Sequence, residues 1–77
     1  MRAYVFITTV AKANPRQIAQ EIGRIAGIKS ADICWGLPDI IATAEAADMK
    51  VLETMVLDQV QKIGGVDKTD THIVAGS

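Results

Sequence analysis

The sequence predicts one α+β domain with the element order β-α-β-β-α-β, and three observations carry that prediction. Two amphipathic helical stretches are each flanked by runs of β-branched and aromatic residues. Each helical stretch ends at glycine and leads directly into a strand. The segments Ile25–Ile28 and Ile63–Val66 mark these two transitions and resemble each other. A doubled β-α-β unit forms a ferredoxin-like, four-stranded antiparallel sheet with two helices on one face.

The first half is expected to contain a strand at residues 2–10, a helix from Asn14 to Gly27 and a strand at residues 28–35. Asn is a good N-cap, and the Pro that follows it is tolerated at the first helical position. Glycine suits the end of a helix because it adopts positive φ without strain. The apolar stripe of this helix consists of Ile18, Ile22 and Ile25.

The second half repeats the plan with a strand at residues 39–46, a helix from Asp48 to Gly64 and a strand at residues 66–75. Asp48 is expected to cap the helix. Between the halves, a Gly-Leu-Pro sequence breaks the chain and predicts a tight turn. The inner face of the second helix is expected to contain Val51, Leu52, Met55, Val56, Val60 and Ile63.

A chain of 77 residues forms a single domain, residues 1–77, with little core of its own. Domains this small usually gain support from a disulfide, a metal ion or a partner subunit. Cys34 is the only cysteine and His72 the only histidine, which excludes an internal disulfide and argues against a structural zinc site. Association with further copies therefore remains as the expected support.

Both faces of the predicted sheet carry apolar residues, which also indicates association. Ile40 and Ile41 are adjacent in one strand, so they point to opposite faces. In residues 2–10, apolar side chains likewise occupy both alternating sets. Because helices cover only one face, the other is expected to pack against a second copy, which gives a dimeric α+β barrel.

Charge and hydropathy exclude several classes of function. The net charge is −1 and no basic run is present, so direct nucleic-acid binding is not expected. No apolar run has the roughly 20 residues of a membrane span, and no signal peptide is indicated. The unpaired cysteine suits a reducing compartment, so the expected location is the cytoplasm.

The sequence offers no catalytic residues, cofactor site or metal site, so an enzyme is not expected. Asp70 and His72 share one strand face and could form a general base, but a polar position near an exposed edge is favoured. For Cys34, a buried and inert thiol is favoured over a nucleophile, since no base or positive cluster lies nearby in the sequence.

The segment around the turn leaves several alternatives open. Asp39 can cap its own turn or receive the amino group of a ligand, with the structural role favoured. Trp35 can pack in the core, line a pocket or lie in a subunit interface. Thr69 and Thr71 share one face of the last strand, either as ordinary strand residues or as hydroxyl partners of a ligand.

The chain resembles the effector-binding domain of the Lrp/AsnC family over almost its whole length. The turn Gly36–Asp39 and the strand residues Ile40–Ala42 resemble that domain's Gly-x-aromatic-Asp turn and apolar strand, with Pro38 in place of the aromatic residue. Residues 63–74 resemble its last helical turn and strand, in which Pro-Gly-Val leads to Thr-x-Thr. Asp48–Ile63 is similar to its second helix.

The resemblance implies an effector-binding and oligomerisation module that binds an amino acid or similar metabolite between dimers. It also implies homodimers that assemble into octamers or decamers. Full-length members carry a helix-turn-helix, which this sequence lacks, so a stand-alone domain that modulates a full-length regulator is expected. The alternative is a small dimeric α+β barrel enzyme of the monooxygenase or isomerase kind. The expected ligand-binding residues are Trp35, Gly36, Leu37, Pro38, Asp39, Thr69 and Thr71.

Overall fold

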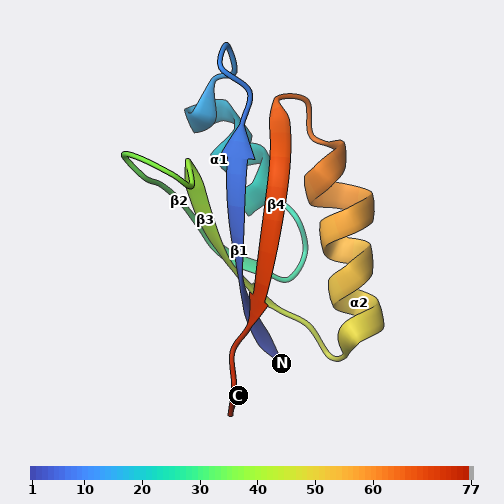
Figure 1. Ribbon diagram of the computed structural model, residues 1–77. Helices are drawn as coiled ribbons and strands as arrows, with labels where there is room; N and C mark the ends of the chain where they lie inside the picture. Colours follow the sequence, from blue (N-terminus) through green and yellow to red (C-terminus); the bar gives the residue numbers. More distant parts are fainter. Residues whose placement is uncertain (77) are drawn as a thin grey trace.

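The computed structural model describes residues 1–76, and its elements follow the predicted order. Ser77, the last residue of the predicted domain, lies outside the described residues. The helix labelled α2 in Figure 1 continues without a break through a wide π-helical turn, Thr54–Gln59, and a 3-10 turn, Val60–Lys62. The elements are β1 (Arg2–Thr9), α1 (Pro15–Gly23), β2 (Ile28–Ile33), β3 (Ile40–Glu45), α2 (Met49–Glu53) and β4 (Val66–Ile73).

The four strands form one antiparallel sheet in the order β2-β3-β1-β4 (Figure 1). The first strand of each half, β1 and β3, lies at the centre, and the second strand of each half, β2 and β4, lies at an edge. Both helices cover the same face of the sheet (Figure 1). The ferredoxin-like α+β fold predicted from the sequence is therefore confirmed.

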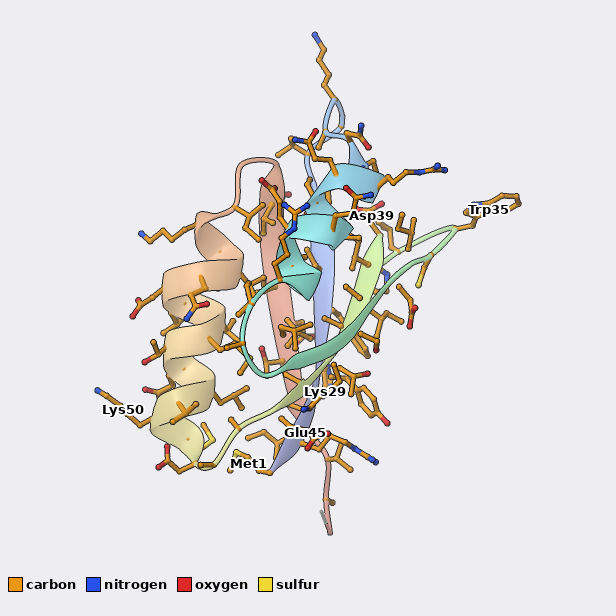
Figure 2. All side chains as sticks on the ribbon, turned by 180° about the vertical axis from the view of Figure 1, so that it is seen from behind. Met1, Lys29, Trp35, Asp39, Glu45 and Lys50 are labelled. Carbon is orange, nitrogen blue, oxygen red and sulfur yellow. The ribbon has the colours of Figure 1, made fainter. Side chains whose placement is uncertain are left out.

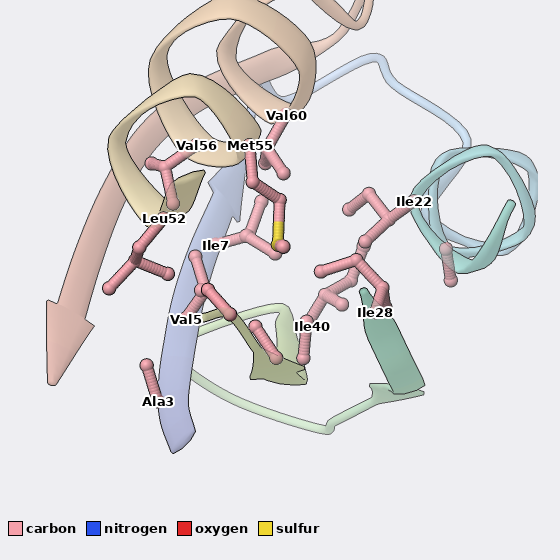
Figure 3. Close-up of a cluster of buried hydrophobic side chains, with 14 of the residues drawn as sticks. Ala3, Val5, Ile7, Ile22, Ile28, Ile40, Leu52, Met55, Val56 and Val60 are labelled. Carbon is pink, nitrogen blue, oxygen red and sulfur yellow. The ribbon is translucent and has the colours of Figure 1, made fainter. Parts of the chain in front are cut away.

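The core lies between the sheet and the helices and is entirely apolar. Alternate residues of the central strands contribute to it: Val5 and Ile7 of β1 and Ile40 of β3 are all fully buried. Figure 3 shows Ile22 of α1 and Met55, from the helix of the second half, meeting these strand residues. Residues 1–76 contain no buried polar or charged side chain. Each large aliphatic side chain buried here stabilises the fold by about 1.5–3 kcal/mol.

The two helix-to-strand transitions are alike in three dimensions, as the sequence match indicated. Gly27 and Gly65 have φ angles of 95° and 96°, a region that favours glycine. The carbonyl oxygen of Gly27 accepts a hydrogen bond from the N–H of Glu45 at 2.8 Å, and that of Gly65 accepts one from the N–H of Val10 at 2.9 Å. Each glycine therefore ties its own half of the chain to the other half.

Two details of the helices differ from the prediction. The first helix ends at Gly23 rather than at Gly27, and the residues between them form turns that bring Gly27 beside β3. Gly23 has low helix propensity, which favours this earlier exit. In the second helix, Val51 is 45% exposed and does not belong to the inner face. The other predicted residues are confirmed, because Leu52, Met55, Val56 and Val60 are buried and Ile63 is partly buried against the same core.

The predicted N-caps are confirmed for both helices. The Asn14 side chain accepts hydrogen bonds from the N–H groups of Arg16 and Gln17 at 3.1 and 3.3 Å. The Asp48 carboxylate accepts one from the N–H of Val51 at 2.9 Å. Within residues 1–76, neither helix has the length and the hydrophobicity that crossing a bilayer requires.

Candidate functional site

The face of the sheet that the helices leave open carries a narrow apolar strip with polar flanks. Phe6 of β1 pairs with Ile41 of β3 in the sheet register, and both side chains are half-buried. Tyr4 lies on the same face and is 37% exposed. The prediction that Ile40 and Ile41 point to opposite faces is confirmed, because Ile40 is buried in the core and Ile41 lies on the open face. The open face is nevertheless less apolar than the sequence suggested, because charged residues border the strip.

Asp70 and His72 lie together on this open face, as strand alternation predicted. The His72 Nε2 atom is 3.0 Å from Asp70 Oδ2, and the imidazole ring packs against Phe6 with ring centroids 4.8 Å apart. Both side chains are more than half exposed. Their position is on the side of the sheet opposite the helices. The enzyme alternative needs a polar cluster between sheet and helices, and this pair does not provide one.

The β2–β3 connection forms a hairpin that projects beyond the rest of the sheet (Figure 2). A hydrogen bond of 2.8 Å from the N–H of Cys34 to the carbonyl of Asp39 closes it. Gly36 has a φ of 114°, and the peptide bond between Leu37 and Pro38 is cis. Trp35 is completely exposed at the tip. The alternative that placed Trp35 in the core is therefore wrong, because the hairpin extends past the core.

Asp39 fixes the base of this hairpin to the central strand. Its Oδ2 atom accepts hydrogen bonds from the backbone N–H of Thr9 at 2.7 Å and from the Thr9 hydroxyl at 3.2 Å. Its own N–H donates to the carbonyl of Ile7 at 3.0 Å. The carboxylate thus has a structural role, although it bonds to β1 rather than to its own turn. These bonds use Oδ2 alone, so the second carboxylate oxygen keeps its capacity to accept.

A hollow of about 390 Å³ lies beside the hairpin at the end of the open face. Lys68 and Asp70 bring opposite charges to it, and neither was singled out as a ligand-binding residue from the sequence. The available signal was strand alternation, which places these two residues of β4 on one face. The hollow is lined by Phe6, Thr8, Leu37, Pro38, Lys68, Thr69 and Asp70.

The two threonines lie in different surroundings. The Thr69 hydroxyl accepts a hydrogen bond from Gln61 Nε2 at 2.7 Å, although the residue also borders the hollow beside the hairpin. Thr71 borders a second hollow, about 200 Å³ in volume, between α2 and β4. Within one chain, the structure therefore brings Thr69 close to Leu37 and Pro38 but leaves Thr71 apart from them. A single cleft containing all of these residues requires two copies of the chain.

Cys34 follows the end of β2 and is half-buried, so the expectation of a buried thiol was too strong. Its sulfur lies 3.8 Å from the carbonyl oxygen of Asp32, a weak contact. Across residues 1–76, no three His, Cys, Asp or Glu side chains gather in an arrangement that could hold a metal ion.

Comparison with known proteins identifies a family. The family model described as the Lrp/AsnC ligand binding domain matches residues 2–77. An uncharacterised HTH-type transcriptional regulator from Pyrococcus abyssi is 29% identical over 62 residues, which cover 80% of this chain and 39% of that protein. The chain thus spans about two-fifths of the length of this relative.

Solved structures share the fold at lower sequence identity. A protein from Thermus thermophilus superposes with a TM-score of 0.90 at 18% identity, over 99% of this chain and 94% of that one. A transcriptional regulator from Neisseria meningitidis, solved as a complex with L-Met, has a TM-score of 0.83 at 20% identity. That match covers 95% of this chain and 48% of the regulator. Both likenesses support the ferredoxin-like architecture described above.

Proposed function

Since the chain belongs to the Lrp/AsnC ligand-binding domain family, we propose that it is an effector-binding and self-assembling module that holds an amino acid or similar small metabolite between dimers. The observation that carries the proposal is the match of a ligand-binding domain to residues 2–77. The hollow beside the hairpin supports it, because the hairpin that borders the hollow projects beyond the rest of the sheet, where a further copy can reach it.

The lining of that hollow suits the two charges of an amino acid. The Lys68 ammonium group can pair with a ligand carboxylate, and the Asp70 carboxylate can pair with a ligand ammonium group. The side chains of Phe6, Leu37 and Pro38 supply an apolar wall. The related Neisseria regulator was solved with L-Met, so free amino acids are the first ligands to test here.

The proposed site extends over the whole turn and both threonines. Asp39 positions the turn through Thr9 and offers its second oxygen to a ligand. Trp35 lies at the projecting end of the hairpin, and both it and Gly36, the next residue, are exposed and available to a neighbouring subunit. Thr71 joins the site from another copy, since within one chain it borders a separate hollow.

Assembly is proposed to begin with a homodimer formed through the open face of the sheet. Phe6, Ile41 and Tyr4 form the apolar strip that such a contact covers. A two-fold axis brings the same strip of each copy together, as isologous interfaces require. Dimers are then proposed to associate into a ring of the octamer or decamer class.

The proposed regulatory role acts through other proteins rather than through direct contact with nucleic acid. The net charge of −1 gives the chain no electrostatic attraction to phosphate backbones. The Pyrococcus relative is an HTH-type regulator of which this chain spans 39%. Mixed assembly with a full-length regulator of that kind is the proposed route by which effector binding changes transcription.

Thermal unfolding in the presence of each of the common amino acids tests the ligand site. A ligand that binds only the folded state, at about 100 times its Kd, stabilises the protein by about 2.7 kcal/mol and raises Tm. The variant Lys68→Gln is expected to lose this increase, and so is Asp39→Ala. Lys62→Gln serves as the matched control, because Lys62 is exposed but does not border the hollow.

The results of this experiment distinguish an error in the proposed site from an error in the proposed ligand class. If one amino acid raises Tm in the wild type and in Lys62→Gln but not in Lys68→Gln, the proposed site is supported. If the increase persists in both Lys68→Gln and Asp39→Ala, the ligand binds elsewhere. If no amino acid raises Tm at millimolar concentration, the ligand class is wrong.

A further inference from the structure

The hairpin tip presents a large apolar side chain that nothing in residues 1–76 covers. Trp35 is 102% exposed and Leu37 is 83% exposed, the two highest values among the large hydrophobic residues. Scattered exposed hydrophobic residues are ordinary. A fully exposed tryptophan on a projecting hairpin is different, because Trp is among the residue types most enriched in the energetic centres of protein interfaces. Figure 2 shows the indole ring extending away from the body of the molecule.

The opposite flank of the molecule has an apolar hollow with no side chain filling it. It lies between α2 and the edge strand β4, with a volume of about 200 Å³. Met49, Leu57 and Ile73 at its border are each about half exposed. The remaining lining residues are Leu52, Glu53, Val56 and Thr71. Of the whole lining, only Glu53 and Thr71 are polar.

The chemistry of the hollow matches that of an indole ring. Trp has one polar group, an N–H that only donates, and this group needs an acceptor when the ring is buried. The Glu53 carboxylate and the Thr71 hydroxyl are both acceptors, and both lie on an otherwise apolar wall. The indole N–H can donate to one of these acceptors, whereas a leucine side chain has no donor to offer either of them. The combination therefore favours Trp35 over Leu37 as the occupant.

We propose that Trp35 of one copy inserts into the α2–β4 hollow of a second copy. The hairpin and α2 lie on opposite flanks of the sheet (Figure 1), so a chain cannot fill its own hollow. The contact is heterologous, because each copy donates a tryptophan on one flank and accepts one on the other. Heterologous contacts repeat from copy to copy and give a closed ring or an open filament.

This contact rests on the proposed self-assembly, because it needs a second copy of the chain. It requires neither a bound ligand nor the face-to-face dimer. It uses the two edges of the sheet and leaves the open face free, so it can link one dimer to the next. It also places Thr71 of one copy near the turn Gly36–Pro38 of its neighbour. The two parts of the candidate site that are separate within one chain then come together between copies.

Trp35 is the only tryptophan, so intrinsic fluorescence reports on this contact directly. With rising protein concentration, the emission is expected to shift to shorter wavelength as the ring leaves water, in step with the mass from light scattering. Leu57→Arg places a charge at the border of the hollow and is expected to abolish the shift. Val51→Arg is the matched control, because Val51 is a similarly exposed apolar residue of α2 that does not border the hollow.

Mixing two variants tests the heterologous geometry. Trp35→Ser keeps an intact hollow, and Leu57→Arg keeps an intact tryptophan, so neither variant alone is expected to grow beyond a dimer. An equimolar mixture is expected to restore one contact between the two variants, with a blue shift and a limited increase in mass. A symmetric contact between two tryptophans would give no such restoration.

Three results would overturn the contact: Trp35→Ser with the wild-type mass, Leu57→Arg with the wild-type blue shift, or a mixture that behaves as the sum of its parts. Ile41→Asp distinguishes failure of this contact from failure of the face-to-face dimer. Ile41 lies on the open face, so this variant is expected to retain the concentration-dependent blue shift even where dimerisation is lost.

Discussion

The two β-α-β halves have the same geometry at their helix-to-strand junctions, Gly27 and Gly65, and different structures at the outer edges of the sheet. At the junctions, Gly27 and Gly65 have φ angles that differ by one degree, and the carbonyl oxygen of each accepts a hydrogen bond from an N–H of the other half. At one edge, β2 continues into a projecting hairpin with Trp35 at its tip. The other edge strand, β4, instead borders an apolar hollow with α2.

The contrast between junctions and edges distinguishes the residues that stabilise the fold from the surfaces that are free to bind other molecules. Both junctions favour glycine, because each has a positive φ and atoms within 3 Å of the Cβ position. The edge strands have no matching glycine contacts. The β2 edge continues into a projecting hairpin, and the β4 edge borders a hollow. Two halves with one shared interior can therefore supply two complementary surfaces.

The largest effect is expected from replacing the first junction glycine. An alanine Cβ at Gly27 would lie 2.8 Å from the Glu45 carbonyl oxygen and would overlap the Met55 side chain. Together with the cost of a positive φ, the clash with a backbone atom is expected to lower the free energy of unfolding by about 3 kcal/mol. Urea denaturation of Gly27→Ala measures the loss.

A smaller loss is expected at the second junction. A Cβ at Gly65 would lie 2.7 Å from Ile18 Cδ1, the end of a side chain that can move. Gly65→Ala should therefore cost about 2 kcal/mol, mainly from its positive φ. Gly23→Ala is the control, since nothing lies within 4 Å of its Cβ position; it should be neutral or stabilising by about 0.5 kcal/mol. Equal losses for Gly27 and Gly65 would mean that a clash with a backbone atom costs no more than a clash with the end of a side chain.

The N-caps of the two helices are expected to contribute almost equally to the free energy of unfolding. Asn14→Ala removes two longer hydrogen bonds and Asp48→Ala removes one shorter bond. Each substitution is expected to lower the free energy of unfolding by about 1 kcal/mol. Thermal unfolding of both variants tests this, and a loss confined to one of them would show that only that helix depends on its cap.

The smallest effect on folding is expected at the hairpin tip. Trp35 is fully exposed in the described part of the chain, so Trp35→Ser should change the free energy of unfolding by no more than about 0.5 kcal/mol when measured on the dissociated chain. Denaturation at low protein concentration makes the comparison. A clear loss under those conditions would mean that the hairpin supports the fold and is not only an association surface.

Glycine positions, caps and apolar periodicity were enough to predict the order of elements, the sheet and both helix starts. The end of α1 was not predictable, because the chain leaves the helix at Gly23 to satisfy a contact between Gly27 and β3 that lies far away in sequence. The exposure of Trp35 depends on how far the hairpin extends past the core, which hydrophobic pattern does not encode.

The candidate site was predictable only in part for the same reason. The turn Gly36–Asp39 was located from its Gly, Pro and Asp residues, but the hydrogen bonds from Thr9 to Asp39 join two strands that are separate in the sequence. Lys68 was missed because a single lysine in a strand carries no signal until the neighbouring strand and hairpin are placed beside it.

The central claim is that the module functions as an assembly whose open sheet face is an interface, and the molar mass in solution tests it most directly. Light scattering after size exclusion, at about ten to one hundred micromolar, should give a wild-type mass of at least two chains. Ile41→Asp should lower it, while Val51→Asp, on exposed α2 surface, should not. A wild-type mass of one chain at all of these concentrations would contradict the account.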